Sequence, residues 1–278
     1  MSILWLGEPS SDNTLVVGAK AANLSILNKT HRIPPGFIIP AKCFSSDEFS
    51  FLKKVISIEY KKLSSLCNST SIQVAVRSSG LFEDSDSASF AGQHKTYLCI
   101  QGEEQLLDAI MKCGQSAMNQ ASDAYREHMS IELEEPALSV IVQQMIPSDV
   151  SGVVFTVNPI SGNTDEIILN TSWGLGESIV NGSVTPDSYI VRKSNFDIIL
   201  SEINEKNVMT VSTPNGPQEI DVPKSLQYLS SLTENQILQV ANLANALETA
   251  MGMPIDAEYA YYHDDLFLLQ CRPISTLQ

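Results

Sequence analysis

The sequence predicts an α+β protein in which helices and antiparallel strands follow one another in mixed order. Amphipathic stretches alternate irregularly with short apolar runs bounded by Gly, Asn and Pro, which argues against a doubly wound parallel sheet. At 278 residues, the chain can bury a full core as one large domain or as two closely packed lobes. We expect one domain over residues 1–278, with one lobe built from residues 1–70 plus 71–135 and a second lobe of residues 136–278.

Composition and charge exclude several classes of protein. Hydrophobic residues make up 43% of the chain and charged residues 18%, as in ordinary globular proteins. The formal net charge of −15 repels nucleic-acid phosphates, and no apolar run approaches the roughly 20 residues that a membrane helix needs. The five cysteines form no CxxC pair, which argues against a zinc site or a disulfide framework. We therefore expect a cytoplasmic protein that binds neither nucleic acid nor a membrane.

The first half of the chain alternates helical and strand signals. Pro34-Pro35-Gly36 breaks the chain before a short apolar run, and Ile72, Val74 and Val76 alternate as in a half-buried strand. A long loop follows, and loops of that length in compact domains tend to be functional. The expected elements are a helix over Ala19–Leu27, a strand over Phe37–Ile39, a helix over about Asp47–Leu63, a strand over Ser71–Arg77, a loop over Ser78–Gln93, a strand over Thr96–Ile100 and a helix over about Glu103–Met129.

The second half is predicted to be richer in strands. Two buried strands are expected over Leu138–Met145 and Gly152–Val157, followed by an antiparallel meander from Glu166 to about Val222. The last helix has the clearest limits. Thr233 with Gln236 forms a capping-box pattern at its start, and Gly252 followed by Pro254 ends it.

A β-hairpin is predicted after that helix. Its strands are Ile255–Tyr262 and Leu266–Arg272, and a turn centred on Asp264 joins them. Such a turn places four polar residues opposite one another in two pairs, Glu258 with Gln270 and Asp256 with Arg272. Because side chains alternate along a strand, all four fall on one face.

This polar face suits a magnesium-phosphate platform. Mg²⁺ prefers a few carboxylates plus substrate oxygens, and an arginine can grip phosphate with two hydrogen bonds. A solvated polar face on an ordinary hairpin is the alternative interpretation of the same four residues.

Three further segments could contact phosphate. Arg77 ends a strand before small hydroxyl residues whose backbone amides can form an anion nest, although an ordinary strand end is the alternative. Ser89–Gln93 could cover a phosphate or be a generic loop. Gly18-Ala19-Lys20 at a helix start could place an ammonium group on a phosphate, but a GxK triplet alone is weak evidence.

Eight motifs in order carry a resemblance to a known family. The stretches are Val17–Lys20, Val76–Ser79 with Glu83-Asp84, Ala88–Gln93, Gln143–Met145, Ser151–Thr156, Trp173–Glu177, Pro186-Asp187, and Asp256–Glu258 with Leu269–Pro273. They resemble the N-terminal nucleotide-binding domain of the phosphoenolpyruvate synthase and pyruvate phosphate dikinase family, which includes rifampin phosphotransferase. The resemblance covers nearly the whole chain, from about Leu15 to Ser275.

The resemblance implies an ATP-grasp fold, with ATP clamped between two lobes, and it implies roles for individual residues. The catalytic, phosphate-binding cations would be Lys20, Arg77 and Arg272. The ligands of Mg²⁺ and the terminal phosphate would be Glu258 and Gln270, with Asp256 beside them. The adenine hinge would comprise Gln143, Gln144, Met145 and Ile146, and the phosphate-covering loop would include Gly92, Gln93 and Thr96. In such a site the cations and Mg²⁺ neutralise charge on the transferring phosphoryl group.

The sequence departs from the family in what is missing. Members continue into a swivelling domain with a phospho-accepting histidine, and usually into a phosphoenolpyruvate or pyruvate domain. None of the four histidines here lies in such a motif. The expected function is therefore a split phosphotransferase subunit whose partner is a separate histidine-bearing protein, with a small molecule as final acceptor. A kinase that phosphorylates a small molecule directly, a non-catalytic ATP-binding module and an excised domain of a longer enzyme are the alternatives.

Overall fold

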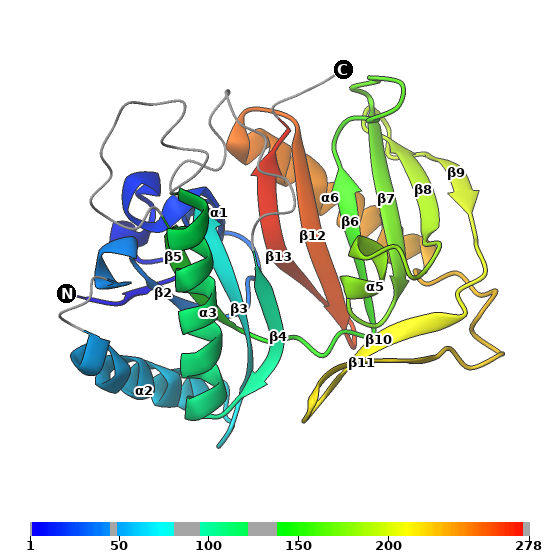
Figure 1. The fold of residues 1–278 in the computed structure, drawn as a ribbon. Coiled ribbons are helices and arrows are strands. Elements are labelled where there is room, and N and C mark those ends of the chain that lie inside the picture. The colour runs from blue at the N-terminus through cyan, green and yellow to red at the C-terminus, as the bar shows by residue number, and fades with distance from the viewer. Residues whose placement is uncertain (1, 45–48, 81–94, 122–137, 275–278) are drawn as a thin grey trace. The chain divides into compact units, whose positions relative to one another are not determined.

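A computed structural model describes residues 2–44, 49–80, 95–121 and 138–274 (Figure 1). The chain divides into two compact units. Unit 1 comprises Met1–Lys29, Pro34–Met145 and Pro214–Gly216, and unit 2 comprises Thr30–Ile33, Ile146–Thr213 and Pro217–Gln278. The expected lobe boundary between residues 135 and 136 lies outside the described residues.

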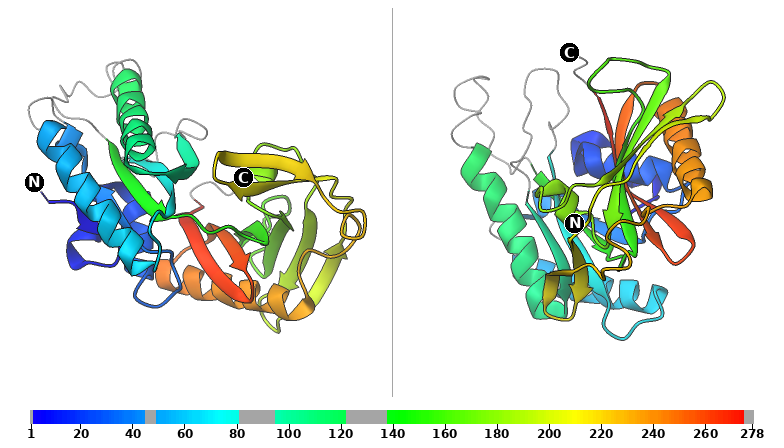
Figure 2. Two further views of the ribbon diagram at one scale, coloured as in Figure 1. Left: turned by 90° about the horizontal axis from the view of Figure 1, so that it is seen from below. Right: turned by 90° about the vertical axis from the view of Figure 1, so that its right-hand side faces the viewer.

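Unit 1 contains an antiparallel sheet in the order β1-β2-β5-β3-β4. Its strands are β1 (Leu4–Trp5), β2 (Gly36–Ile39), β3 (Gln73–Gly80), β4 (Thr96–Gln101) and β5 (Leu138–Gln144). Its helices are η1 (Pro9–Ser11), α1 (Thr14–Leu27), η2 (Ala41–Phe44), α2 (Phe49–Leu66) and α3 (Glu103–Ala121). Side chains of α2 and α3 such as Ile56, Leu63 and Ile110 form one apolar core with Val74 and Val76 of β3. The helices α2 and α3 therefore cover one face of this sheet, as Figures 1 and 2 show.

Two elements of unit 1 differ from their predictions. Ser78–Gly80 continues β3 and pairs with Leu138–Val140 of β5, so the predicted loop begins later than Ser78. The first helix begins at Thr14, where the Asn13 side chain accepts a hydrogen bond from the Leu15 amide. Small hydroxyl residues read as loop signals in the sequence, but strand pairing on β5 satisfies their backbone groups here.

Unit 2 contains a six-stranded antiparallel sheet in the order β13-β12-β6-β7-β8-β9. Its strands are β6 (Val150–Phe155), β7 (Glu166–Trp173), β8 (Asp187–Arg192), β9 (Ile198–Glu202), β12 (Ile255–Tyr262) and β13 (Asp265–Pro273). The ribbon β10 (Val208–Thr213) and β11 (Gly216–Asp221) forms a separate two-stranded sheet. Within the predicted meander, β7, β8 and β9 are consecutive neighbours in this sheet, whereas β10 and β11 form a sheet of their own.

The helix α6 (Glu234–Met251) packs on one face of this six-stranded sheet. Facing it is a row of buried residues, one per strand, that runs through Cys271, Ala257, Val154, Leu169 and Tyr189. The capping box at its start and the left-handed Gly252 at its end confirm the predicted limits of this helix. The predicted α+β class is also confirmed, and the two antiparallel sheets with flanking helices agree with the architecture that the family resemblance implies.

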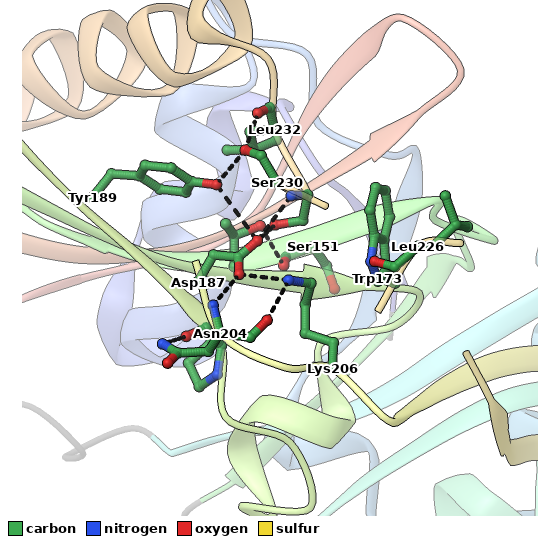
Figure 3. A network of polar contacts seen from close by, with 12 residues as sticks. Ser151, Trp173, Asp187, Tyr189, Asn204, Lys206, Leu226, Ser230 and Leu232 are labelled. Carbon is green, nitrogen blue, oxygen red and sulfur yellow. Dashed lines mark hydrogen bonds and ion pairs between the residues drawn. The ribbon is translucent and has the colours of Figure 1, made fainter. Parts of the chain in front are cut away.

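A fully buried ion pair ties the irregular parts of unit 2 to the sheet (Figure 3). Lys206 donates to the Asp187 carboxylate at 2.6 Å, and both side chains are 0% exposed. The second carboxylate oxygen accepts hydrogen bonds from the backbone amide and the hydroxyl of Ser231, each at 2.8 Å. The amide of Asn204 donates to the first oxygen at 3.0 Å. Strand β8, the segment before β10 and the segment before α6 therefore meet at one satisfied carboxylate.

Glycine at two positions allows close packing in unit 2. Gly174 has φ of +77°, and an added methyl group would collide with the carbonyl oxygen of Thr210 in β10. The short helix α5 (Glu177–Val180) follows directly. At Gly152, an added methyl group would lie 2.5 Å from the hydroxyl of the buried Tyr259. Gly174 of the Trp173–Glu177 motif and Gly152 of the Ser151–Thr156 motif are therefore required by close packing.

Of the helices that the structure describes, none combines the length and the apolar character needed to cross a membrane.

Candidate functional site

The polar hairpin face predicted from the sequence is present on β12 and β13. Glu258 lies opposite Gln270, and Asp256 lies opposite Arg272, which confirms the predicted pairing. Their neighbours Ala257 and Cys271 are buried towards α6. Because side chains alternate along a strand, the four polar residues lie on the face of the sheet opposite α6.

The turn of this hairpin differs from the prediction. Tyr262 pairs with Asp265, so the turn contains two residues, and His263 adopts the left-handed conformation with φ of 53°. A bulge between Glu258 and Tyr259 then leaves Leu269 as an extra residue on β13. The bulge restores the register that a three-residue turn would have produced, because it adds one residue to one strand. Strict alternation from Cys271 would place Leu269 in the core, but Leu268 faces the core instead and is 1% exposed.

Asp256 holds Arg272 in a fixed orientation. The Nε and Nη2 atoms of Arg272 donate to the two carboxylate oxygens of Asp256 at 3.1 Å and 2.7 Å. The Asp256 side chain is 18% exposed and that of Arg272 is 40% exposed. A two-point pair of this kind restricts the guanidinium geometrically while solvent still reaches much of the group.

The thiol of Cys271, between Gln270 and Arg272 on β13, is buried and has a raised pKa. Burial, and secondly the negative charge of Asp256, raise the pKa of Cys271 to about 12. The opposing effect of Arg272 is smaller. Cys271 is therefore a neutral core residue and not a candidate for thiolate chemistry at the site.

Glu258 and Gln270 supply a carboxylate and an amide as direct cross-strand neighbours. Gln270 is 8% exposed, and Glu258 is partly buried. Residues opposite each other on antiparallel strands have Cβ atoms about 4.5–5.5 Å apart, so both side chains can reach one ligand. Among the described residues, no group of three His, Cys, Asp or Glu could hold a metal ion. A cation between Glu258 and Gln270 would take further oxygen ligands from water or from a bound phosphate.

Asn170 on β7 is a further polar residue of this face that the sequence pattern does not predict. It lies in the same cross-sheet row as Glu258 and Gln270, with Val153 of β6 between them. The Ser188 hydroxyl donates to Asn170 Oδ1 at 2.8 Å, which fixes the amide. Only the strand register places this residue on the polar face, and the sequence pattern alone did not specify that register.

Unit 1 brings three predicted cation and loop residues to one end of β3. Arg77 is 9% exposed and lies directly opposite Thr96 on β4. Ser79, two residues further along β3, accepts a 3.2 Å hydrogen bond from the amide of Ala21. The helix α1 is interrupted by non-helical φ and ψ at Gly18. The bond to Ser79 attaches the turn after Gly18, which carries Lys20, to the same end of β3.

The expected adenine hinge spans the unit boundary, which falls between Met145 and Ile146. The amides of Gln144 and Met145 each donate a 2.9 Å hydrogen bond to a backbone carbonyl of unit 1. The Gln143 side chain is 2% exposed and donates to another carbonyl at 3.1 Å. The bond to Pro34 gives the Gln143 side chain a structural role, which the sequence pattern does not indicate.

Gly92, Gln93 and most of the expected phosphate-covering loop lie outside the described residues. Thr96 is the residue of that group that the structure describes, and it is exposed at the start of β4.

The described residues thus include, in unit 2, a polar platform of carboxylates, an amide and an arginine, and separately, in unit 1, an arginine and a lysine near one end of β3. These residue types are suited to binding phosphate. Comparisons with known proteins agree. The family described as "Pyruvate phosphate dikinase, AMP/ATP-binding domain" matches residues 49–278, and the chain belongs to this family.

Named relatives lie among phosphotransfer enzymes. A phosphoenolpyruvate synthase of Pyrococcus furiosus is 39% identical over 243 residues, which cover 84% of this chain and 30% of that protein. The uncharacterized phosphotransferase YvkC of Bacillus subtilis is 33% identical over 293 residues, which cover 96% of this chain and 34% of that protein. The chain thus spans about a third of the length of these relatives, and its family is one of ATP-dependent phosphotransferases.

Among solved structures, the dinucleotide forming acetyl-coenzyme A synthetase 1 of Ca. Korarchaeum cryptofilum covers 92% of this chain and 92% of its own, at 10% identity and a TM-score of 0.43. A likeness this distant assigns no function.

Proposed function

We propose that this chain binds Mg-ATP and transfers a phosphoryl group to a histidine on a separate protein, as one subunit of a split dikinase-type phosphotransferase. The observation that carries the proposal is the polar hairpin face, where Glu258 is paired with Gln270 and Asp256 with Arg272. Family membership supports nucleotide binding by this domain.

The donor set of the hairpin fits magnesium. Glu258 and Gln270 offer a carboxylate oxygen and an amide oxygen as direct neighbours on adjacent strands. Mg²⁺ typically keeps one or two carboxylates and takes its remaining ligands from water and substrate phosphates. The charge of Asp256 is already balanced by its ion pair with Arg272, so the four side chains together carry about one negative charge. When bound, Mg²⁺ would screen the charge of the phosphate oxygens.

Each residue of the proposed site then has a separate task. Arg272, oriented by Asp256, binds phosphate oxygens of ATP and stabilises the charge that develops on the transferring group. Lys20 and Arg77 bind other phosphate oxygens. Glu258 and Gln270 hold the metal, and Thr96 contacts the phosphates from the start of β4. Residues 143–146 contact the adenine edge, and we expect the Ile146 amide to be the donor because those of Gln144 and Met145 already donate elsewhere.

The acceptor is proposed to lie on another protein. None of the four histidines belongs to a phospho-accepting motif of the kind found in the family. A phosphorylated histidine on a partner would pass the group to a small molecule. A kinase that acts directly on a small molecule and a non-catalytic ATP-binding module are the competing outcomes of the test below.

The test uses the 278-residue chain and ATP labelled at either the β- or the γ-phosphate. We expect calorimetry to detect ATP binding that strengthens with Mg²⁺. We also expect label to move to protein only when a candidate histidine-bearing partner is added. ADP formation with a small-molecule acceptor and no partner would exclude the split enzyme, and absence of nucleotide binding would exclude both catalytic functions.

Substitutions at the hairpin test the assignment of residues. We expect Glu258→Ala and Arg272→Ala each to lower turnover by about a hundredfold or more, as when a contact to the transferring phosphate or its metal is lost. Matched controls lie in the same unit: Glu219→Ala on β11 and Arg192→Ala at the end of β8, both at exposed positions, should leave the rate unchanged. Near-normal turnover in either hairpin variant would refute the role of that residue.

A further inference from the structure

The helix α1 is broken at Gly18. Gly18 has φ of 78° and ψ of 162°, which are not helical. The helix therefore consists of two consecutive pieces, Thr14–Val17 before Gly18 and a longer piece after it. In a continuous helix, the Ala21 amide would donate to the carbonyl of Val17, four residues earlier. The break removes this bond and leaves one donor and one acceptor to be satisfied by other groups.

Two serines of the sheet supply the missing partners. The Ser79 hydroxyl on β3 accepts from the Ala21 amide at 3.2 Å. The Ser139 hydroxyl on β5 donates to the carbonyl of Val17. Ser79 and Ser139 lie directly opposite each other on the paired strands, and both are 0% exposed. One cross-strand pair of hydroxyls therefore replaces one helical hydrogen bond.

The contact between the break and the sheet is close and leaves little freedom. A methyl group added at Gly18 would collide with the Ser79 hydroxyl and with the carbonyl oxygens of Ser79 and Gly80. Positive φ is also unfavourable for any residue with a Cβ atom. Ser139 further lies 3.2 Å from the carbonyl oxygen of Ser79, within hydrogen-bonding distance. The first turn after the break is thereby held against the end of β3.

Lys20 lies in this first turn, immediately before Ala21, and Arg77 lies on β3 two residues before Ser79. We propose that Ser79 and Ser139 are positioning residues for the reaction, and that they set the direction of Lys20 relative to Arg77 for binding the phosphates of ATP. The proposal rests on the function proposed above. It extends the site to Ser139, a residue outside all the family motifs that the sequence displays.

The experiment is a double-mutant cycle on ATP affinity, measured by calorimetry with Mg²⁺ on the full chain. We expect Ser139→Ala and Ser79→Ala each to weaken ATP binding by about threefold to tenfold, the range for one lost hydrogen bond. In a Lys20→Ala background, the same substitutions should change ATP affinity less than about twofold, because they act through Lys20. A purely structural effect would weaken binding equally in both backgrounds and would overturn the proposal.

Ser25→Ala is the matched control. Ser25 lies in the same helix and is 0% exposed, and its hydroxyl has no hydrogen-bond partner among the described residues. It should leave ATP affinity unchanged, so a loss equal to that of Ser139→Ala would also overturn the proposal.

Hydrogen exchange on the unsubstituted chain gives a reading that needs no variant. The Ala21 amide should exchange as slowly as the Leu24 and Ser25 amides later in α1. Fast exchange at Ala21 would contradict the serine pair as its anchor. If the unsubstituted chain does not bind ATP at all, the proposed function fails together with this inference. If it binds ATP and the cycle is additive, this inference alone fails.

Discussion

Removing one partner of the buried ion pair between Asp187 and Lys206 should destabilise unit 2 strongly. In Lys206→Met the apolar stem of the side chain is kept, but a carboxylate that is 0% exposed loses its cation. Loss of one partner of a buried pair typically costs about 3–5 kcal/mol of the free energy of unfolding. Asp187→Asn should have a cost of similar size, because it leaves the ammonium group of Lys206 buried without its anion.

The double variant should be less destabilised than the sum of the two single variants, since neither charge then remains buried. An exposed pair gives the control. Lys112 and Asp108 form an ion pair on α3 with side chains 53% and 60% exposed, so Lys112→Met should cost less than about 1 kcal/mol.

The assay is urea unfolding followed by tryptophan fluorescence. The chain has two tryptophans, Trp5 in unit 1 and Trp173 in unit 2. Trp173 donates from its indole nitrogen to the Leu226 carbonyl at 3.1 Å, close to the ion pair (Figure 3). In a Trp5→Phe background, the Trp173 signal should therefore report the loss. Costs below about 1 kcal/mol for both single variants would refute the reasoning that desolvated charges stabilise each other here.

Three further outcomes follow from local geometry. Gly174→Ala should lower the free energy of unfolding by about 1–3 kcal/mol because of the positive φ alone, and the collision with Thr210 should add to this loss. Urea unfolding measures the loss, and an unchanged unfolding midpoint would contradict the close approach of Gly174 to Thr210. Burial raises the pKa of Cys113 to about 12, so at pH 8 a smaller fraction of this cysteine is the reactive thiolate than for an exposed cysteine. Burial raises the pKa of Cys67 less, so mass spectrometry after alkylation at pH 8 should find Cys67 modified before Cys113. Equal labelling rates of these two cysteines in the folded chain would contradict this prediction. Thr233→Ala removes a capping box and should cost about 1 kcal/mol, measured by thermal unfolding; a stability gain would count against the cap.

The polar hairpin shows what the sequence could and could not specify. Alternation and an assumed turn centre at Asp264 predicted the pairs at the site correctly. The turn itself has two residues, and the bulge at Leu269 compensates for the missing one. A bulge has no clear sequence signal in a run of apolar residues, so the correct register was reached by the wrong turn.

The break in α1 was outside the reach of local patterns for a related reason. The sequence pattern places Gly18 before the first helix, whereas the structure has helical residues on both sides of it. What stabilises the break is a pair of serines, Ser79 and Ser139, that come from distant parts of the chain. The ion pair between Asp187 and Lys206 is similar, because charge spacing in the sequence gives no sign that both side chains are completely buried. Contacts between separate segments of the chain decide both the break and the ion pair, and periodicity does not report such contacts.

Unit 2 is not a continuous piece of chain. Thr30–Ile33 belongs to it, although the residues on either side belong to unit 1. The carbonyl of Arg32 accepts a 2.9 Å hydrogen bond from the Leu268 amide on β13, and Arg32 also forms an ion pair with Asp265. On the ribosome, Arg32 is therefore made early but finds its partner only when the last strand has been synthesised. These contacts at β13 can form only after Asp265 and Leu268 have been synthesised, and a fragment starting at Ile146 would lack Thr30–Ile33, which makes them.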